Sequence, residues 1–200
     1  MKVHLLRHQL RETTWRAILD AAEDVAAAEG ASRASLQAIA ERAGVAVGTI
    51  YNHFHDKEEL LQELFTRRRE ELYAQIDRTT KAHGREPFAR QLEAFVAAVF
   101  EYFDSRRAFL RLSVESEKPA VVKGKDGRRR PAMRQLQDRA ERIVRIGLRE
   151  KCLRGGNASL LAAVLVSIVR GVLVLLAHGD QPFVSETQRV VSLFLHGAGR

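Results

Sequence analysis

The stretch SLQAIAERAGVAVGTIYNHFHDKEEL, residues 35–60, decides the fold. Ser35 is a suitable N-cap for a short helix, and Gly44 can adopt the positive φ that a tight turn after this helix requires. Ala40 is small where a second helix would cross the first. Four apolar residues lie at the offsets that would anchor both helices to the preceding one: Leu36, Ile39, Val45 and Ile50. This combination predicts a helix-turn-helix.

The second helix of this motif has the residues that DNA recognition requires. Val47, Gly48 and Thr49 make its N-terminal end slim, so its backbone can approach base edges in a major groove. The next turn and the flanking helices supply hydrogen-bonding groups for bases and phosphates. The predicted DNA-binding residues are Ser35, Gln37, Val47, Gly48, Thr49, Tyr51, Asn52, His53 and Lys57.

These residues resemble the DNA-binding domain of the TetR family of bacterial transcriptional regulators. The resemblance rests on Gly-Val-x-x-Gly-Thr-Ile-Tyr-x-His-Phe-x-x-Lys, which begins at Gly44, and on AILDAAEDVAAAEG before it. It covers about residues 13–61, and Val25 departs from the phenylalanine that is common in the family. The resemblance implies that the predicted residues contact an operator. It also implies a helical second domain in which a small ligand binds and two subunits pair.

Composition and charge set wider limits. The 200 residues are 46% hydrophobic and 29% charged, which is typical of a soluble globular protein. The net charge is +8, but the seven basic and seven acidic residues of the first 57 positions cancel, so bulk charge does not support DNA binding. Half of the excess lies in the loop 123–130, KGKDGRRR. The single cysteine, Cys152, excludes an intrachain disulfide and favours the cytoplasm.

Apolar residues recur at helical spacing throughout, which predicts an all-α protein. We expect a helix-turn-helix DNA-binding domain over residues 1–55 and a helical effector-binding and dimerisation domain over residues 56–200. The expected segments are a loose basic arm over 1–11, a helix from Thr13 or Thr14 to Glu29, a helix from Asp56 to Gly84, a continuous helical run from Pro87 to Pro119, a helix from Pro131 ending at Gly155–Gly156, and two C-terminal helices.

The helix over residues 158–177 is apolar nearly all round and long enough to cross a membrane. Its small residues, its charged Arg170 and the amphipathic helix that follows favour a subunit interface instead. A homodimer would also place two copies of the second helix of the motif in successive major grooves, about 34–36 Å apart, on a near-palindromic operator. The predicted interface residues are Leu161, Leu165, Ile168, Val172, Leu176, Val191 and Phe194.

A cavity for a small-molecule effector of unknown identity is expected in the second domain. The residues predicted to line it are Phe95, Val99, Phe103, Phe109, Leu112, Leu136 and Ile143, although aromatic residues at helical spacing also suit a plain core. Two functions are compatible with the motif. One is a repressor released by a ligand, and the other is a DNA-binding adaptor that acts through a protein partner.

Catalytic and metal sites are not expected. The sequence has no nucleophile paired with a base, no phosphate-binding loop and no cluster with metal-ligand spacing, so we expect neither an enzyme nor a metal or other cofactor. His53 and His55 would lie on different faces of a helix. Arg67–Arg69 is interpreted as a solvated helix face. Cys152 lies among basic residues, which suits either a redox sensor or an inert thiol.

Overall fold

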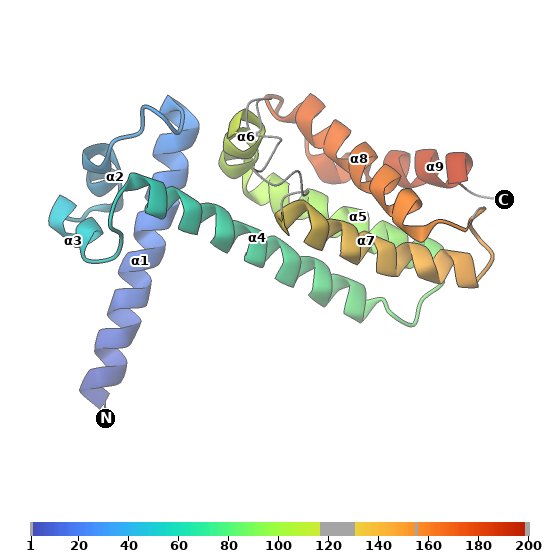
Figure 1. Ribbon diagram of the computed structural model, residues 1–200, viewed down its shortest axis with the longest axis horizontal. Helices are drawn as coiled ribbons and strands as arrows, with labels where there is room; N and C mark the ends of the chain where they lie inside the picture. Colours follow the sequence, from blue (N-terminus) through green and yellow to red (C-terminus); the bar gives the residue numbers. More distant parts are fainter. Residues whose placement is uncertain (1, 117–130, 155, 199–200) are drawn as a thin grey trace.

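The computed structural model of the chain describes residues 2–116, 131–154 and 156–198. These residues are helical as predicted, in the order α1 (Lys2–Glu29), α2 (Leu36–Ala43), α3 (Val47–Tyr51), α4 (Lys57–Ala82), α5 (Phe88–Ser105), α6 (Arg107–Ser116), α7 (Pro131–Arg149), α8 (Ala158–Leu176), the 3-10 turn η2 (Phe183–Glu186) and α9 (Thr187–Ala198). Helices α1–α3 form one end of an elongated molecule and α5–α9 form the other (Figure 1). Helix α4 runs between the two ends.

Helix α1 begins at Lys2, so the predicted loose arm and the predicted helix start at Thr13 or Thr14 are wrong. The Thr13 and Thr14 hydroxyls donate to the carbonyls of Gln9 and Leu10, at 2.9 and 3.0 Å, and are therefore satisfied inside the helix. Residues 2–12 contain neither glycine nor proline, and most of them favour a helix. The N-terminal part of α1 consequently projects from the body of the molecule (Figure 1).

Two later helix boundaries also differ from the prediction. The expected continuous helix after residue 87 breaks at Arg106, where φ −134° and ψ 47° end α5 and allow α6 to change direction. Helix α7 ends at Arg149 rather than at Gly155–Gly156. Lys151 adopts φ +58°, and the amide of the residue after it donates to the Gly147 carbonyl at 2.8 Å. A lysine thus takes the left-handed position that glycine usually fills after a helix.

The interior consists of two hydrophobic clusters, and α4 contributes to both. Leu60 and Leu64, in the first turns of α4, are fully buried together with residues of α1, α2 and α3. Ile76, three turns later, is fully buried with residues of α5, α7, α8 and α9. The predicted domain boundary at residue 55 falls just before α4. Because one continuous helix belongs to both clusters, a shift of packing in one can displace the other.

Helix α5 lies at the centre of the second cluster, and a close contact joins its first turn to α7. Phe88 is 1% exposed, and a Cβ built on Gly147 would lie 2.6 Å from its ring. Glu150, just beyond α7, accepts a hydrogen bond from the Phe88 amide at 3.1 Å. Gly147 is therefore needed because the phenyl ring occupies the space that any other side chain would fill.

A buried ionic network joins α1 to α4. The Arg68 side chain is 3% exposed, and its Nε donates to Glu23 at 2.6 Å. Its remaining nitrogens pair with Asp20 of α1 and with Glu71 of α4. Arg106, at the break between α5 and α6, approaches Asp20 to 3.4 Å. The interpretation of Arg67–Arg69 as a solvated face is therefore wrong for Arg68, because α1 covers that side of α4.

Burial and pairing act against each other within this network. Burial raises the pKa of Glu23 above its ordinary value, and the charge and hydrogen bond of Arg68 oppose that rise. Burial also lowers the pKa of Arg68, but Glu23, Asp20 and Glu71 outweigh this effect, so the pKa is raised and the guanidinium stays charged. Removal of Arg68 would leave the buried Glu23 without the guanidinium that is hydrogen-bonded to it.

Candidate nucleic-acid interface

Helix α2 is capped at both ends as the sequence predicts. The Ser35 hydroxyl accepts a hydrogen bond from the Ala38 amide at 3.1 Å. Gly44 has φ +68°, and the Val45 amide bonds back to the Ala40 carbonyl at 3.0 Å. This left-handed turn directs the chain into α3 after two linking residues, Val45 and Ala46. The helix-turn-helix geometry therefore follows from residues within the motif itself.

Helix α3 leaves one side of its backbone uncovered. Ile50 is fully buried and anchors α3 to the first cluster, whereas Tyr51 is 58% exposed. Val47 is partly buried against the same cluster, so only part of its side chain can reach a partner. Gly48 is exposed, and a Cβ built there would meet nothing within 4 Å. Nothing inside the protein requires a glycine at position 48, although glycine in a helix costs about 0.5–1 kcal/mol relative to alanine.

Besides Ser35, two of the predicted DNA-binding side chains have partners within the chain. The Lys57 ammonium donates to the Ser32 carbonyl at 2.8 Å, which ties the start of α4 to the loop after α1. The Gln37 amide donates to Glu41, one turn later on α2, at 3.1 Å. Either side chain would have to exchange its present partner for a phosphate or a base.

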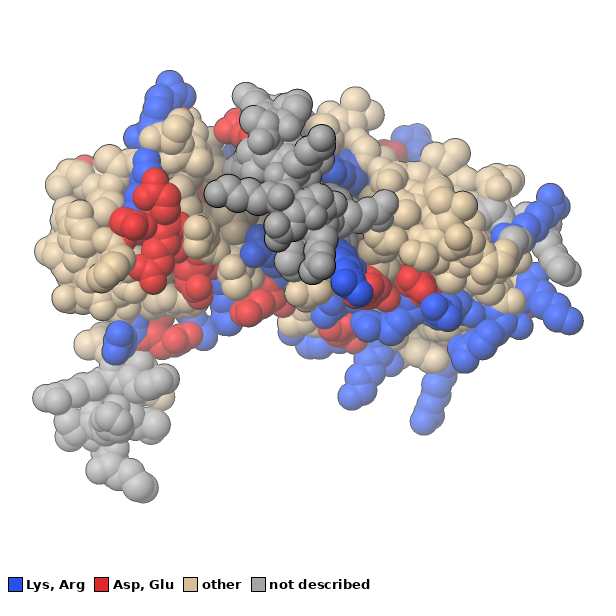
Figure 2. Space-filling model, viewed as in Figure 1, with Lys and Arg blue, Asp and Glu red and all other residues tan. Residues whose placement is uncertain are grey.

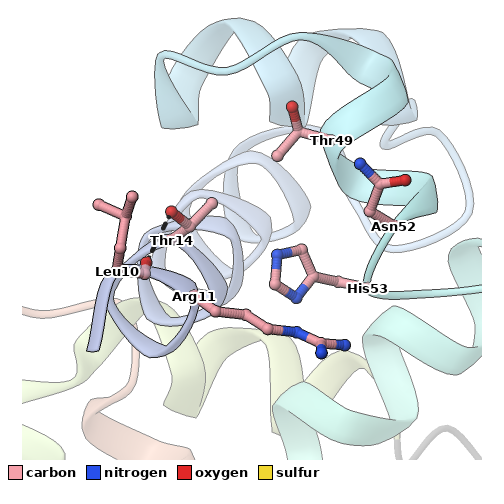
Figure 3. A pocket seen from close by; sticks show the side chains of 6 residues that line it. All are labelled: Leu10, Arg11, Thr14, Thr49, Asn52 and His53. Atoms are coloured by element: carbon pink, nitrogen blue, oxygen red, sulfur yellow. Dashed lines mark hydrogen bonds between the residues drawn. The ribbon is translucent and has the colours of Figure 1, made fainter. Parts of the chain in front are cut away.

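A groove of about 450 Å³ separates α1 from α3 (Figure 3). One wall is formed by Leu10, Arg11 and Thr14 of α1, and the other by Thr49, Asn52 and His53. Burial lowers the pKa of His53, and the positive charge of Arg11 lowers it further, so the imidazole is mostly neutral at pH 7. Thr49, Asn52 and His53 were predicted to contact DNA, but the residues of α1 that form the opposite wall were not among the predicted DNA-binding residues. Only the absence of glycine and proline before residue 13 indicated that α1 extends far enough to form it.

On the face shown in Figure 2, the end of the molecule that carries α2 and α3 is mostly uncharged or acidic. Basic side chains gather instead over the other end, where the exposed arginines of α7 include Arg142, Arg145 and Arg149. This distribution agrees with the balance of charges in the first 57 residues. Recognition at α3 would therefore depend on hydrogen bonds and close backbone approach more than on a broad positive field.

The residues predicted to line an effector cavity lie in two different clusters. Phe95, Val99, Phe109 and Ile143 are buried in the second cluster, and Phe103 and Leu136 are packed against it. The Phe103 and Phe109 rings are stacked, with 6.2 Å between their centroids. Leu112 belongs to the first cluster, because α6 packs against α1. The assignment of all seven residues to an effector cavity remains a prediction.

The predicted interface residues mostly face their own subunit. Leu165, Val191 and Phe194 are buried in the second cluster, and Leu161, Ile168, Val172 and Leu176 are packed against it. Their role at a subunit interface stays a prediction. The exposed apolar residues of α8 and α9 include Leu160, Val164, Leu175 and Leu193. Among the described residues, α8 is the one helix long and apolar enough to cross a membrane, and 22% of its apolar window is buried.

The remaining predicted features are local. Cys152 is exposed, and its thiol lies 3.7 Å from the Glu150 carbonyl oxygen. Redox sensing by this thiol stays a prediction, and the basic loop 123–130 lies outside the described residues. Within the described ranges, no group of three or more His, Cys, Asp or Glu side chains is placed to hold a metal ion.

Comparisons with known proteins identify the chain. Residues 18–64 match the family model of bacterial regulatory proteins of the tetR family. Over 196 residues the chain is 28% identical to the transcriptional repressor BepR of Brucella suis, an alignment that covers 92% of this chain and 87% of BepR. The DNA-binding domain of the chain belongs to the TetR family. This membership agrees with the prediction that it is a regulator and not an enzyme.

Other known proteins match over different lengths. The transcriptional regulator SrpR of Pseudomonas putida is 44% identical over 61 residues, which are 30% of this chain and 29% of SrpR, so the chain spans less than a third of that relative. The crystal structure of FadR from Bacillus subtilis in complex with stearoyl-CoA matches with a TM-score of 0.77 at 20% identity. That match covers 92% of this chain and 98% of FadR, and it shows that the second domain shares the fold.

Proposed function

We propose that this TetR-family protein is a cytoplasmic, homodimeric transcriptional repressor. It binds a near-palindromic DNA operator through α2 and α3, and it leaves the operator when a small-molecule effector binds its second domain. The family membership supports this proposal, as does the description of its relative BepR as a transcriptional repressor.

The observation that carries the proposal is the uncovered face of α3. Gly48 has open space beside its backbone, and the neighbouring Tyr51 projects into solvent. Helix α3 lies at the outer edge of the molecule, away from the helices of the second domain (Figure 1). A slim helix end with hydrogen-bonding residues in the next turn is the shape that fits a major groove.

Dimerisation is supported by the exposed face of α8. One stripe of this helix is buried in the subunit, at Ala158, Ala162, Leu165, Val169 and Leu173. The other side presents Leu160, Val164 and Leu175 to solvent, and Leu193 of α9 is also exposed. A second copy of the same two helices would remove this apolar surface from water. The pair would then present two α3 helices to successive major grooves.

Effector control requires a mechanical connection between the two clusters. Helix α4 belongs to both, and α6 of the second domain packs against α1 of the DNA-binding end. The Arg68 network joins the same elements at their crossing. A ligand that moves α5 or α6 would therefore change the position of α1 relative to α4, and with it the spacing of the two reading helices. Because such coupling is reciprocal, the effector must bind the DNA-bound form more weakly.

Selection of duplexes from a random-sequence pool tests the DNA-binding part. The purified full-length chain should enrich a near-palindromic sequence. Sedimentation should then find an even number of subunits bound to each selected duplex. Failure to enrich any sequence would contradict the proposal. A chain that enriches a site but releases it only with a second protein, and with no small molecule tested, would favour the adaptor function instead.

A further inference from the structure

Four hydrogen-bonding side chains line the groove between α1 and α3 (Figure 3). Arg11 approaches from α1, and Thr49, Asn52 and His53 approach from the opposite wall. Over residues 2–116, 131–154 and 156–198, none of these four side chains makes a hydrogen bond or an ion pair with another described residue. Among the described residues, no carboxylate lines the groove.

Arg11 differs in this respect from nearby arginines. Arg16 pairs with Glu12 at 3.0 Å, and Arg42 pairs with Asp24 at 2.6 Å. Arg33 donates to the carbonyl of Glu29 at the end of α1. Arg11 is exposed and has no such partner in the described part of the chain. An unpaired guanidinium beside three further donors is arranged for an anion with several acceptor oxygens.

We infer that this groove is the seat of one DNA backbone phosphate, on the strand that borders the major groove entered by α3. Arg11 supplies the positive charge, and Thr49, Asn52 and His53 supply hydrogen-bond donors. The seat is continuous with the exposed face of α3, since Thr49 belongs to that helix and lies one residue beyond Gly48. This inference rests on the proposed function, because it assigns α1 as a further element that contacts the same duplex.

The helical state of residues 2–12 is what makes such a seat possible. A loose arm would carry Arg11 on a flexible chain, whereas α1 holds it opposite His53. Since the lowered pKa of His53 leaves its ring mostly neutral, Arg11 carries the charge of the groove at pH 7. Loss of Arg11 should therefore remove one whole phosphate contact per subunit.

The test compares Arg11→Ala with Arg16→Ala in the full-length protein, by fluorescence anisotropy over a range of NaCl concentrations. Both variants remove one arginine from α1, and alanine favours a helix, so the fold should be retained. The probes are the duplex selected from the random pool and a scrambled duplex of equal length. Arg11→Ala should reduce the slope of log K against log salt by about 0.9 per bound subunit, and weaken binding about eightfold per subunit at 0.1 M salt.

Arg16→Ala should leave the slope unchanged, and Arg11→Lys should keep it. The loss in Arg11→Ala should be equal for the two duplexes, because a phosphate contact carries no sequence information. An unchanged slope would overturn the seat while leaving the proposed function intact. An equal loss of affinity in Arg16→Ala would also overturn the seat. A loss of affinity confined to the selected duplex would overturn it as well, because it would indicate contact with a base. If the wild-type chain bound neither duplex, the proposed function itself would fail.

Discussion

A side chain at position 48 should separate folding stability from DNA binding. Gly48 is the second residue of the five-residue helix α3, and its backbone is helical, so leucine can adopt the same conformation. A Cβ there meets nothing within 4 Å, so substitution should cause no clash inside the protein. We therefore expect Gly48→Leu to fold normally and to bind DNA poorly.

The substitution should raise the free energy of unfolding and lower the affinity for DNA. Replacing a helical glycine should raise the free energy of unfolding by about 0.5 kcal/mol, at the lower end of the usual range because α3 is short. The melting temperature should rise by about 1–2 °C for a chain of this size. On the operator, the leucine side chain would hold the backbone away from the bases. Loss of one base contact costs about 1–3 kcal/mol, so a dimer should lose at least about 30-fold in affinity.

Thermal unfolding and anisotropy titration against the selected duplex measure the two effects. Gly48→Ala should give a smaller loss of affinity, and Gly197→Ala is the matched control. Gly197 is also a helical glycine with nothing within 4 Å, and it lies in α9 at the other end of the molecule. Wild-type affinity in Gly48→Leu would refute the assignment of this face to DNA. A destabilised Gly48→Leu would refute the claim that the space beside α3 is open.

The double variant Leu160→Glu and Leu193→Glu should be a folded monomer, because the two leucines are 60% and 62% exposed on the proposed dimer interface. A dimer that persists in sedimentation velocity would contradict this interface. Gly147→Ala should lower the free energy of unfolding by about 1–3 kcal/mol in a urea titration, because the new methyl would lie 2.6 Å from a buried phenyl ring. Wild-type stability would mean that the ring can move aside. Arg68→Met should lower the free energy of unfolding by about 3–5 kcal/mol, because Asp20 and Glu23 of α1 lose the guanidinium that pairs with both of them. The adjacent Arg69→Ala serves as its control, and an equal loss in both variants would show that Arg68 has no special role.

Local chemistry made the helix-turn-helix predictable. Ser35 caps α2, Gly44 turns the chain in a left-handed conformation, and Asp56 caps α4 by accepting from the Glu59 amide at 2.7 Å. Each of these features depends on residues no more than five positions apart, so sequence spacing was sufficient to predict them. The exposure of Gly48 followed from the same spacing, because Ile50 can be buried only if the opposite face of α3 points outward.

Features that depend on distant neighbours were not predictable in this way. The arginines at positions 67–69 look alike in sequence, and Arg68 is buried only because α1 crosses α4 at that turn. Helix α8 is apolar on nearly every side, so its sequence does not distinguish the face covered by its own subunit from the face left exposed. Leu112 joined the first cluster because the chain bends at Arg106.

The sequence by itself determined most of the helical segments, where the helix-turn-helix lies and which of its residues are exposed, since caps, turns and apolar spacing act over a few residues. The tertiary structure alone decided which charges are buried, which face of α8 is free and that the start of α1 faces α3 across a groove. The physical reason is that burial and pairing depend on the relative placement of whole helices. That placement is determined by packing summed over many distant residues.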